Sequence, residues 1–415
     1  MLVAFTLENY KSFREQQTLS FVSSNGDEHL EHTILLNNGL RINRFAALIG
    51  GNGSGKTQLI TALNDFARAI HNDNLHELHM PYLFSKENRL KATSYEVIIL
   101  DEEKENFFRY GVSVFAGSIE NEYLYSRPVK KGARESCIFT RDQNGLSFKK
   151  SEYKKHETLI KPILKSSGAV ITFARSLEIY ELNETRYWAV QQLPYSPESF
   201  IDDGLEFFEE RLEAELEKDD KGRTVMDKRV KNLVNMYGNF ITKSPLHIDS
   251  VDFIPIGSEK KYHFVYKIKN IDGGFTSIGP SDRYQFFSQG TINILTFLAA
   301  MVWASDGIFT LYVDEVDASI HHSLATTLIS DILKFYSSRD DMQFVLSTHN
   351  IPLLDECFRR DELNIIVKDD TKSSKIINAA NFSIRKDAKI SAKYFRGEFG
   401  ALPSFLGFSD NEKEK

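Results

Sequence analysis

Apolar residues near the start of the chain fall into short blocks that are typical of strands. Residues 3–7 alternate apolar and polar positions, and Thr18–Phe21 resumes the pattern after a turn, which predicts a hairpin. Phe45–Ile49 is continuously apolar, which predicts a buried strand, and Gln58–Phe66 has the pattern of a helix. A glycine-rich loop joins the last two blocks, so we expect a strand, a tight loop and a helix in succession.

Strand-like blocks also fill residues 92–150. They are separated by turn residues such as Asp142–Gly145, and their length and spacing predict an antiparallel β lobe. The blocks are Tyr95–Leu100, Phe107–Phe115, Glu122–Tyr125, Cys137–Thr140 and Leu146–Phe148.

The periodicity changes to that of helices over residues 151–245. An apolar stripe at helical spacing and a second helical block predict a mainly helical insertion there. The stripe and the block are Leu205, Phe208, Leu212 and Leu216, and Val225–Asn239.

Strands resume at His247–Ile256 and Tyr262–Ile268, and beyond residue 285 apolar helices and strands alternate. This alternation is typical of an α/β core. We therefore expect four parts, which are the N-terminal half of the core, the β lobe, the helical insertion and the C-terminal half of the core. Their ranges are 1–91, 92–150, 151–245 and 246–415.

The composition of the 415 residues is that of an ordinary globular protein, with 41% apolar and 26% charged residues. The formal net charge of −7 disfavours a broadly basic nucleic-acid binder but allows a local basic patch. Two cysteines far apart in sequence form neither a zinc pattern nor a disulfide framework, which favours the reducing cytoplasm. The start lacks the features of a signal peptide, and the longest apolar run, Ile292–Ala304, is too short to span a bilayer, so no membrane is expected as a partner.

The glycine-rich loop, Gly50–Thr57, fits the phosphate-loop pattern G-x-x-x-x-G-K-[ST] at every fixed position. Its glycines let backbone N–H groups wrap a polyphosphate, and the helix that follows adds its positive N-terminus. Lys56 is expected to reach the β and γ phosphates, and the Thr57 hydroxyl to ligate Mg²⁺. The alternative, a glycine-rich turn that contains Lys-Thr by chance, is disfavoured by the strand before the loop and the helix after it.

Two later apolar blocks each end in polar residues. Ile308–Val313 is followed by Asp314 and Glu315, and in phosphate-loop enzymes such carboxylates hold Mg²⁺ and activate the attacking water, respectively. The block that begins at Gln343 leads to His349, which either contacts the γ-phosphate or makes a backbone contact at the strand end.

Polar residues at two further places are candidates for binding phosphate or for lying at a subunit interface. Ser288–Gly290 precedes the apolar helix Ile292–Trp303, and this arrangement both caps a helix and suits phosphate oxygens. Asp317 lies just beyond Glu315, where we expect it to lie along a subunit interface.

Two features leave alternatives open. Tyr10 and Phe13, in the turn of the first hairpin, either stack on adenine or pack in the sheet, and packing is the commoner role of such rings. The basic run Lys149–Lys155 either contacts a nucleic-acid backbone or is a solvated loop, and its small number of lysines favours the loop.

The motifs, in this order, resemble those of the ATP-binding-cassette (ABC) class of ATPase, the group that contains the SMC, RecF and overcoming-lysogenisation-defect proteins. The resemblance implies an α/β fold, namely a P-loop ATPase head with a mixed or parallel β core and an antiparallel β lobe, plus a mainly helical insertion. It implies ATP and Mg²⁺ as ligands, and a homo-oligomer, either a dimer of heads or a larger ring, in which the signature segment of one head completes the site of another. The positions that match the nucleotide contacts of the class are Gly50, Asn52, Gly53, Gly55, Lys56, Thr57, Gln58, Ser288, Gly290 and Asp317; Thr57 and Asp314 match its metal ligands, and Glu315 and His349 its catalytic residues.

Three stretches look like a bacterial subgroup named AAA family ATPases, which are built like cassette heads rather than ring-type motors. The stretches are Phe5–Phe13, Ser319–Leu324 and Lys393–Pro403. The subgroup includes the RloA- and AbiL-type abortive-infection ATPases and the ATPase subunits of the PARIS and Septu defence systems. The resemblance implies a cytoplasmic sensor or scaffold that controls a separate effector, such as a nuclease, after a DNA or phage-protein trigger. The alternatives are a RecF- or SMC-like ATPase that clamps DNA and a non-enzymatic, ATP-dependent scaffold.

The chain departs from the class in two respects. Its signature, Phe287–Gly290, reads Phe-Ser-Gln-Gly where the class commonly has Leu-Ser-Gly-Gly or Leu-Ser-Ser-Gly. No Q-loop glutamine can be assigned. No nuclease motif is recognised in the sequence either, so we expect any effector activity on another polypeptide.

Overall fold

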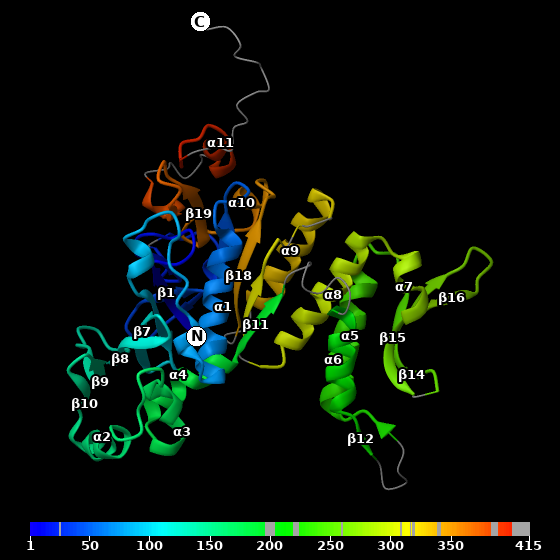
Figure 1. The fold of residues 1–415 in the computed structure, drawn as a ribbon. Helices are drawn as coiled ribbons and strands as arrows, with labels where there is room; N and C mark the ends of the chain where they lie inside the picture. The colour runs from blue at the N-terminus through cyan, green and yellow to red at the C-terminus, as the bar shows by residue number, and fades with distance from the viewer. Residues whose placement is uncertain are drawn as a thin grey trace, which may run out of the picture.

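The computed structural model describes residues 1–24, 26–195, 204–218, 224–258, 260–307, 309–315, 317, 320–337, 342–382 and 389–400. A mostly parallel sheet lies at the centre, and an antiparallel sheet lies to one side of it (Figure 1). One long helix is packed between the two sheets, and helices from later in the chain cover the far face of the parallel sheet. Ile308, Ser319 and residues 401–403, which belong to segments considered above, lie outside the described residues.

Six strands form the central sheet: β5 (Phe45–Ile49), β11 (Gln192–Tyr195), β17 (Phe309–Val313), β18 (Met342–Thr348), β19 (Leu363–Lys368) and β20 (Ser374–Asn378). Their order is β11-β17-β18-β5-β19-β20, and all neighbours run parallel except β19 and β20. Strand β5 is buried along its whole length, as predicted, because both faces of the sheet are covered.

Successive residues of β5 face opposite layers, as the two-residue period of a strand requires. Ala46 and Leu48 pack in the core that includes the antiparallel sheet. Phe45, Ala47 and Ile49 pack in a second core with the later helices. Strand β5 therefore joins the two cores, and the loop that follows it leaves the sheet at the carboxyl edge.

The predicted β lobe is present as part of a seven-stranded antiparallel sheet. Its strands are β1 (Leu2–Glu8), β2 (Gln17–Ser20), β6 (Thr93–Leu100), β7 (Asn106–Phe115), β8 (Ser118–Pro128), β9 (Ser136–Asp142) and β10 (Gly145–Phe148). The order is β10-β9-β8-β7-β6-β1-β2, and β1 pairs with both β2 and β6. The N-terminal hairpin and the lobe therefore form one continuous sheet.

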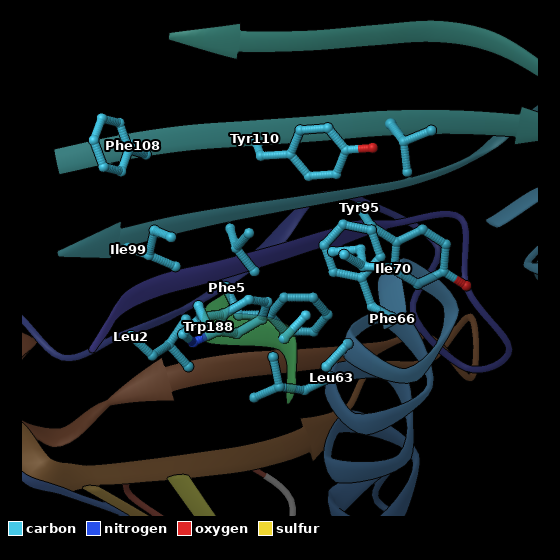
Figure 2. Close-up of a cluster of buried hydrophobic side chains, with 14 of the residues drawn as sticks. Leu2, Phe5, Leu63, Phe66, Ile70, Tyr95, Ile99, Phe108, Tyr110 and Trp188 are labelled. Carbon is cyan, nitrogen blue, oxygen red and sulfur yellow. The ribbon is translucent and has the colours of Figure 1, made fainter. Parts of the chain in front are cut away.

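Helix α1 (Lys56–Asn72) lies between the two sheets. Its Leu63, Phe66 and Ile70 lie among side chains of the antiparallel sheet (Figure 2). The Phe66 ring stacks on Tyr95 of β6 with 5.3 Å between the ring centroids. This packing fixes the direction in which the N-terminus of α1 points.

Four longer helices lie on the other side of the central sheet (Figure 1): α5 (Gly204–Ala214), α6 (Lys228–Lys243), α8 (Gln289–Ala304) and α9 (His322–Ser337). Helix α8 contacts both β17 and β11, and α5 and α6 pack on α8. Beyond α6 lies a small antiparallel sheet with the order β14-β15-β16, formed by β14 (Ser250–Ile256), β15 (Lys261–Lys269) and β16 (Phe275–Ile278).

The remaining elements are short, apart from α4 (Tyr180–Val190), which packs on α1. They are α2 (Lys154–Ile160), α3 (Ala174–Leu177), α7 (Pro280–Phe286), α10 (Leu353–Glu356), α11 (Ile390–Phe395), and the strand pairs β3 (Thr33–Leu35) with β4 (Arg41–Asn43) and β12 (Glu217–Lys218) with β13 (Thr224–Val225). In the described part of the chain, no helix is both long enough and apolar enough to cross a bilayer.

The predicted fold class is confirmed: the chain has a parallel β core, an antiparallel β lobe and a mainly helical middle region. Residues 151–245 contribute on both sides of the core, because α2 and α4 lie against the antiparallel sheet whereas α5 and α6 lie against α8. The strand expected from His247 begins at Ser250, since His247 itself has a left-handed backbone with φ 56° and belongs to a turn.

Candidate nucleotide-binding site

Three segments that carry predicted site residues leave the central sheet at one edge. Strands β17, β18 and β5 are adjacent and parallel, and Thr348 at the end of β18 pairs with Ile49 at the end of β5. The carboxyl ends of parallel strands share an edge, and ligands of α/β proteins bind there. The edge brings together Gly50–Thr57 after β5, Asp314–Glu315 after β17 and His349 after β18.

The phosphate loop needs glycine at positions where the backbone is crowded or left-handed. A Cβ on Gly50 would lie 2.3 Å from the backbone oxygen of Ile366 in β19. Gly53 has φ 72° and Gly55 has φ 117°, conformations that residues with a side chain rarely adopt. Asn52 and Gly53 are exposed at the tip of the loop, and α1 begins directly after Gly55.

Two serines that the sequence analysis did not select brace this loop from the side. Ser374 of β20 is fully buried, and its hydroxyl lies 2.5 Å from the Ser54 carbonyl oxygen and 2.7 Å from the Ser12 hydroxyl. The backbone N–H of Ser12 donates to the side-chain oxygen of Gln58 at 3.1 Å. Gln58, expected at the nucleotide, thus holds the hairpin turn against the start of α1.

Lys56 is almost fully buried and turns back on its own loop. Its ammonium group donates to the backbone oxygen of Gly50 at 2.9 Å and lies 3.4 Å from that of Gly51. Burial lowers the pKa of Lys56, and the nearby carboxylates of Asp314 and Glu315 act in the opposite direction. A cation held among backbone oxygens and carboxylates is placed to exchange these partners for phosphate oxygens.

Ser347 of β18 contacts both residues at the end of β17, through the Asp314 carboxylate and the Glu315 backbone. Its hydroxyl donates to Asp314 Oδ1 at 2.5 Å and accepts the backbone N–H of Glu315 at 2.8 Å. Ser347 and Asp314 are buried, whereas Glu315 is half-buried and has a left-handed backbone with φ 50°. A non-glycine residue in this region is uncommon and often marks a functional position.

A hydrogen bond joins Asp317, which follows β17, to His349, which follows β18. The His349 backbone N–H lies 3.2 Å from one carboxylate oxygen of Asp317 and 3.4 Å from the other, and the His349 side chain is exposed. Asn350 is buried and its side-chain amide donates to the His322 backbone oxygen at 3.1 Å. His349 is therefore presented to solvent at the site by hydrogen bonds to its backbone and its neighbour.

The predicted signature residues begin helix α8. The Ser288 hydroxyl accepts the backbone N–H of Thr291 at 3.1 Å, which makes Ser288 the N-cap, as predicted. Ser288 is exposed and Gly290 is half-buried. Among the described residues, no hydrogen bond or ion pair joins Ser288 or Gly290 to the phosphate loop.

The structure decides between the two roles considered for Tyr10 and Phe13. Both side chains are fully buried, and the Tyr10 ring packs edge-on against Tyr95 with 5.9 Å between centroids. They are core residues and do not form an adenine platform. The unassigned Q-loop glutamine is a separate question. Gln191 precedes β11 and Gln192 begins it, so neither of these glutamines lies at the carboxyl edge of the central sheet.

Comparison with known proteins found similar solved structures only. No family model matches the sequence, and no curated protein matches it. The SMC head domain from Thermotoga maritima is 14% identical over 91% of this chain and 98% of that chain, with a TM-score of 0.43. The SmcHead bound to the C-winged helix domain of ScpA is 15% identical over 91% of this chain and 96% of that chain, with a TM-score of 0.45.

The donor set at the sheet edge fits a magnesium–triphosphate group. The side chains of Asp314 and Thr57 offer the oxygen ligands that Mg²⁺ prefers. The crowding at Gly50 and the left-handed backbone at Gly53 and Gly55 show a loop whose course favours residues without a Cβ. Lys56 supplies the single buried positive charge that the phosphate-loop motif places at the loop.

Proposed function

We propose that this chain binds ATP with Mg²⁺ and hydrolyses it, in the manner of an ABC-type ATPase head. The observation that carries the proposal is the shared sheet edge, where the Lys56 loop lies close to Asp314 and Glu315. When bound, Mg²⁺ supplies positive charge to the β and γ phosphates. Thr57 and Asp314 would hold the ion, and Lys56 would orient the phosphates.

Within this proposal, Glu315 is the general base and His349 contacts the γ-phosphate. Glu315 is half-buried, and its backbone N–H is bonded by Ser347, which supports a fixed course of the chain at this residue. A positioned carboxylate can accept the proton of the attacking water. The exposed side chain of His349 extends from the adjacent strand end and can donate a hydrogen bond to a phosphate oxygen.

The site is completed in trans by a second copy of the chain. Ser288 and Gly290 lie at the exposed start of α8, unconnected to the phosphate loop of their own chain within the described residues. A serine hydroxyl and the N-terminus of a helix suit phosphate oxygens. The homo-oligomer would be a dimer of heads or a ring of such dimers, with Asp317 near the interface.

The biological role we propose is that of a cytoplasmic sensor or scaffold that controls a separate effector, such as a nuclease, in anti-phage defence. Support comes from the sequence stretches that resemble the abortive-infection ATPases. The alternative, a DNA-clamping ATPase, needs a basic face on the dimer. Lys150, in the densest basic run, already pairs with Glu181, which reduces the charge available for a phosphate backbone.

The experiment compares Lys56→Ala and Glu315→Gln with the unmodified chain. We expect Lys56→Ala to lose ATP binding because the phosphates lose their cation. We expect Glu315→Gln to retain ATP through gel filtration and to hydrolyse it about 10²- to 10⁴-fold more slowly, the usual effect of losing a general base.

Lys334→Ala is the control, since Lys334 is exposed on α9 and its removal should leave both measurements unchanged. Circular dichroism spectra confirm that each variant is folded. Full-speed hydrolysis by Lys56→Ala, or loss of ATP binding by Glu315→Gln, contradicts the assignment.

A further inference from the structure

A cluster of two histidines and a glutamate lies at the opposite edge of the central sheet from the phosphate loop. It occupies the short helical turn η1 (Leu30–His32) and the residue before it. The His32 backbone oxygen accepts the N–H of Arg44, and the His32 ring packs edge-on against Phe45 with 4.8 Å between centroids. Phe45 begins β5, whereas the phosphate loop follows its end, so the two sites are separated by the length of a strand.

The side chains of this cluster converge. One ligand atom from each of His29, Glu31 and His32 lies within 4.8 Å of those of the other two. The His29 Nδ1 atom is 3.2 Å from a Glu31 carboxylate oxygen. His32 is buried, whereas His29 and Glu31 are exposed, so the cluster is anchored on one side and open to solvent on the other.

A buried carboxyl group, that of Glu362, contacts the cluster from the protein interior. Glu362, in the turn η7 (Arg360–Glu362) before β19, is fully buried, and its Oε2 atom lies 3.2 Å from His32 Nδ1. The same oxygen accepts the backbone N–H of Arg359 at 2.8 Å, and the other oxygen has no hydrogen-bond partner. A carboxylate that accepts the Nδ1–H of a histidine leaves Nε2 free and fixes the ring, an arrangement typical of metal-ligating histidines.

We propose that His29, Glu31 and His32 bind a divalent transition-metal ion of the Zn²⁺ class, with Glu362 orienting His32. Imidazole and carboxylate together suit Zn²⁺, which forms sites with two histidines and one glutamate, whereas Mg²⁺ prefers oxygen ligands alone. A fourth position faces solvent. The ion would fasten His29 and Glu31 to the buried His32, whose contact with Glu362 joins η1 to the turn before β19.

The charges around the cluster are compatible with a cation. Two guanidinium groups, those of Arg359 and Arg44, lie near His32. Asp361 pairs with Arg359, with 2.9 Å between Nη2 and Oδ2. The exposed carboxylate of Glu31 supplies negative charge at the cluster. This inference does not depend on the proposed ATPase function, because neither the ligands nor the edge of the sheet is shared.

The test uses the full chain after chelator treatment, without nucleotide. We expect one Zn²⁺ to bind per chain in competition with a chromophoric chelator, and Co²⁺ to give the visible absorption of a low-coordinate site. Zn²⁺ should also raise the Tm, because an ion that binds only the folded state stabilises it. Mg²⁺ should neither compete for this site nor raise the Tm through it.

The variant His29→Gln removes an exposed ligand, so it should fold normally. Its Zn²⁺ affinity should fall at least about tenfold, because losing a residue that only hydrogen-bonds a metal ligand already lowers metal affinity by about that much. His71→Gln is the matched control, since His71 is an exposed histidine at the end of α1. Asp314→Asn controls for Zn²⁺ at the candidate Mg²⁺ site and should retain the binding. The proposal is overturned if the unmodified chain shows no stoichiometric binding, or if His29→Gln and His71→Gln bind Zn²⁺ equally.

Discussion

Ser347 contacts both Asp314 and Glu315, the two acidic residues at the end of β17. It is fully buried, and a single hydroxyl bonds both the Asp314 carboxylate and the Glu315 backbone. A hydroxyl that donates to one group and accepts from the next fixes their relative position. Ser347 is therefore a positioning residue for both, and it does not itself contact the nucleotide in our proposal.

We predict that Ser347→Ala lowers kcat and raises the Mg²⁺ concentration needed for half-maximal hydrolysis. The reason is that Asp314 loses the hydrogen bond that orients it, and the Glu315 N–H loses its partner, at about 1–3 kcal/mol of folding stability. Steady-state phosphate release at varied Mg²⁺ measures the first effect, and urea unfolding the second.

Ser347→Thr should restore much of the Mg²⁺ response, because it keeps a hydroxyl at the same place. Ser305→Ala removes another buried hydroxyl, at the end of α8, and should affect stability without changing the Mg²⁺ requirement. If Ser347→Ala responds to Mg²⁺ as the unmodified chain does, the positioning role is wrong.

Sequence reasoning selected residues that belong to a recognised pattern and missed those that act across the fold. The phosphate loop and the carboxylates after β17 were selected from their motifs, and the structure places both at one sheet edge. Ser12, Ser347 and Ser374 carry no pattern, and Ser12 and Ser374 meet only because β20 lies beside the phosphate loop. The Tyr10 and Phe13 rings show the opposite case, since the sequence allowed two roles and burial decided between them.

Among the elements, α7 shows how the segment before the signature is held. Arg283 of α7 is fully buried, and its Nη2 atom donates to Glu209 Oε1 of α5 at 2.6 Å. Glu209 also accepts the backbone N–H of Phe264 at 2.9 Å. A helix of the middle region, a strand of the small sheet and the helix that leads to Ser288 are thus joined at one buried ion pair.

We predict that Arg283→Met lowers the free energy of unfolding by about 3–5 kcal/mol, because the buried Glu209 loses its arginine partner. The His263 ring, whose Nδ1 lies 2.8 Å from Glu209 Oε2, remains in contact with it. The double variant Arg283→Met with Glu209→Leu should recover much of this loss, since both charges are then absent. Urea unfolding measures both.

Arg229→Met is the control for the loss of an arginine. Its ion pairs with Glu215 and Asp306 are at the surface, where such pairs contribute about 0–1 kcal/mol. An effect of Arg283→Met no larger than that of Arg229→Met would show that the buried pair does not hold α7.

The existence and type of most elements could be predicted from the sequence, but their partners could not. The alternation in 92–150 gave five strands that are all present, because their buried side chains join a core shared with α1, α2 and α4. Strand β11 was missed, since it is short and contains Pro194. It is found at the edge of the central sheet, the position in which a strand tolerates proline.

For the whole molecule, the proposed completion of the site in trans can be tested with a pair of variants. We predict that Ser288→Arg hydrolyses ATP poorly although it still binds ATP, because the large side chain blocks the approach of the partner's phosphates. Mixing Ser288→Arg with Lys56→Ala should restore part of the activity. In the mixed dimer one site combines an intact loop with an intact signature.

Phosphate release by each variant alone and by the mixture is the measurement, with size-exclusion chromatography in the presence of ATP to follow the dimer. Mixing Ser288→Arg with unmodified chain at the same total concentration is the reference. If the mixture of the two variants stays as inactive as either alone, a site completed in trans is excluded.

The place of β5 in the central sheet also constrains how the chain is made. Phe45 pairs with Phe344 on one side, so a central strand emerges from the ribosome roughly 300 residues before its neighbour. At about 5–20 residues per second this interval is on the order of 15–60 s. The antiparallel sheet needs only early partners and can form during that time. The nascent chain must therefore carry an apolar β5 without its β18 neighbour until β18 has been synthesised, and the proposed nucleotide site cannot form before then.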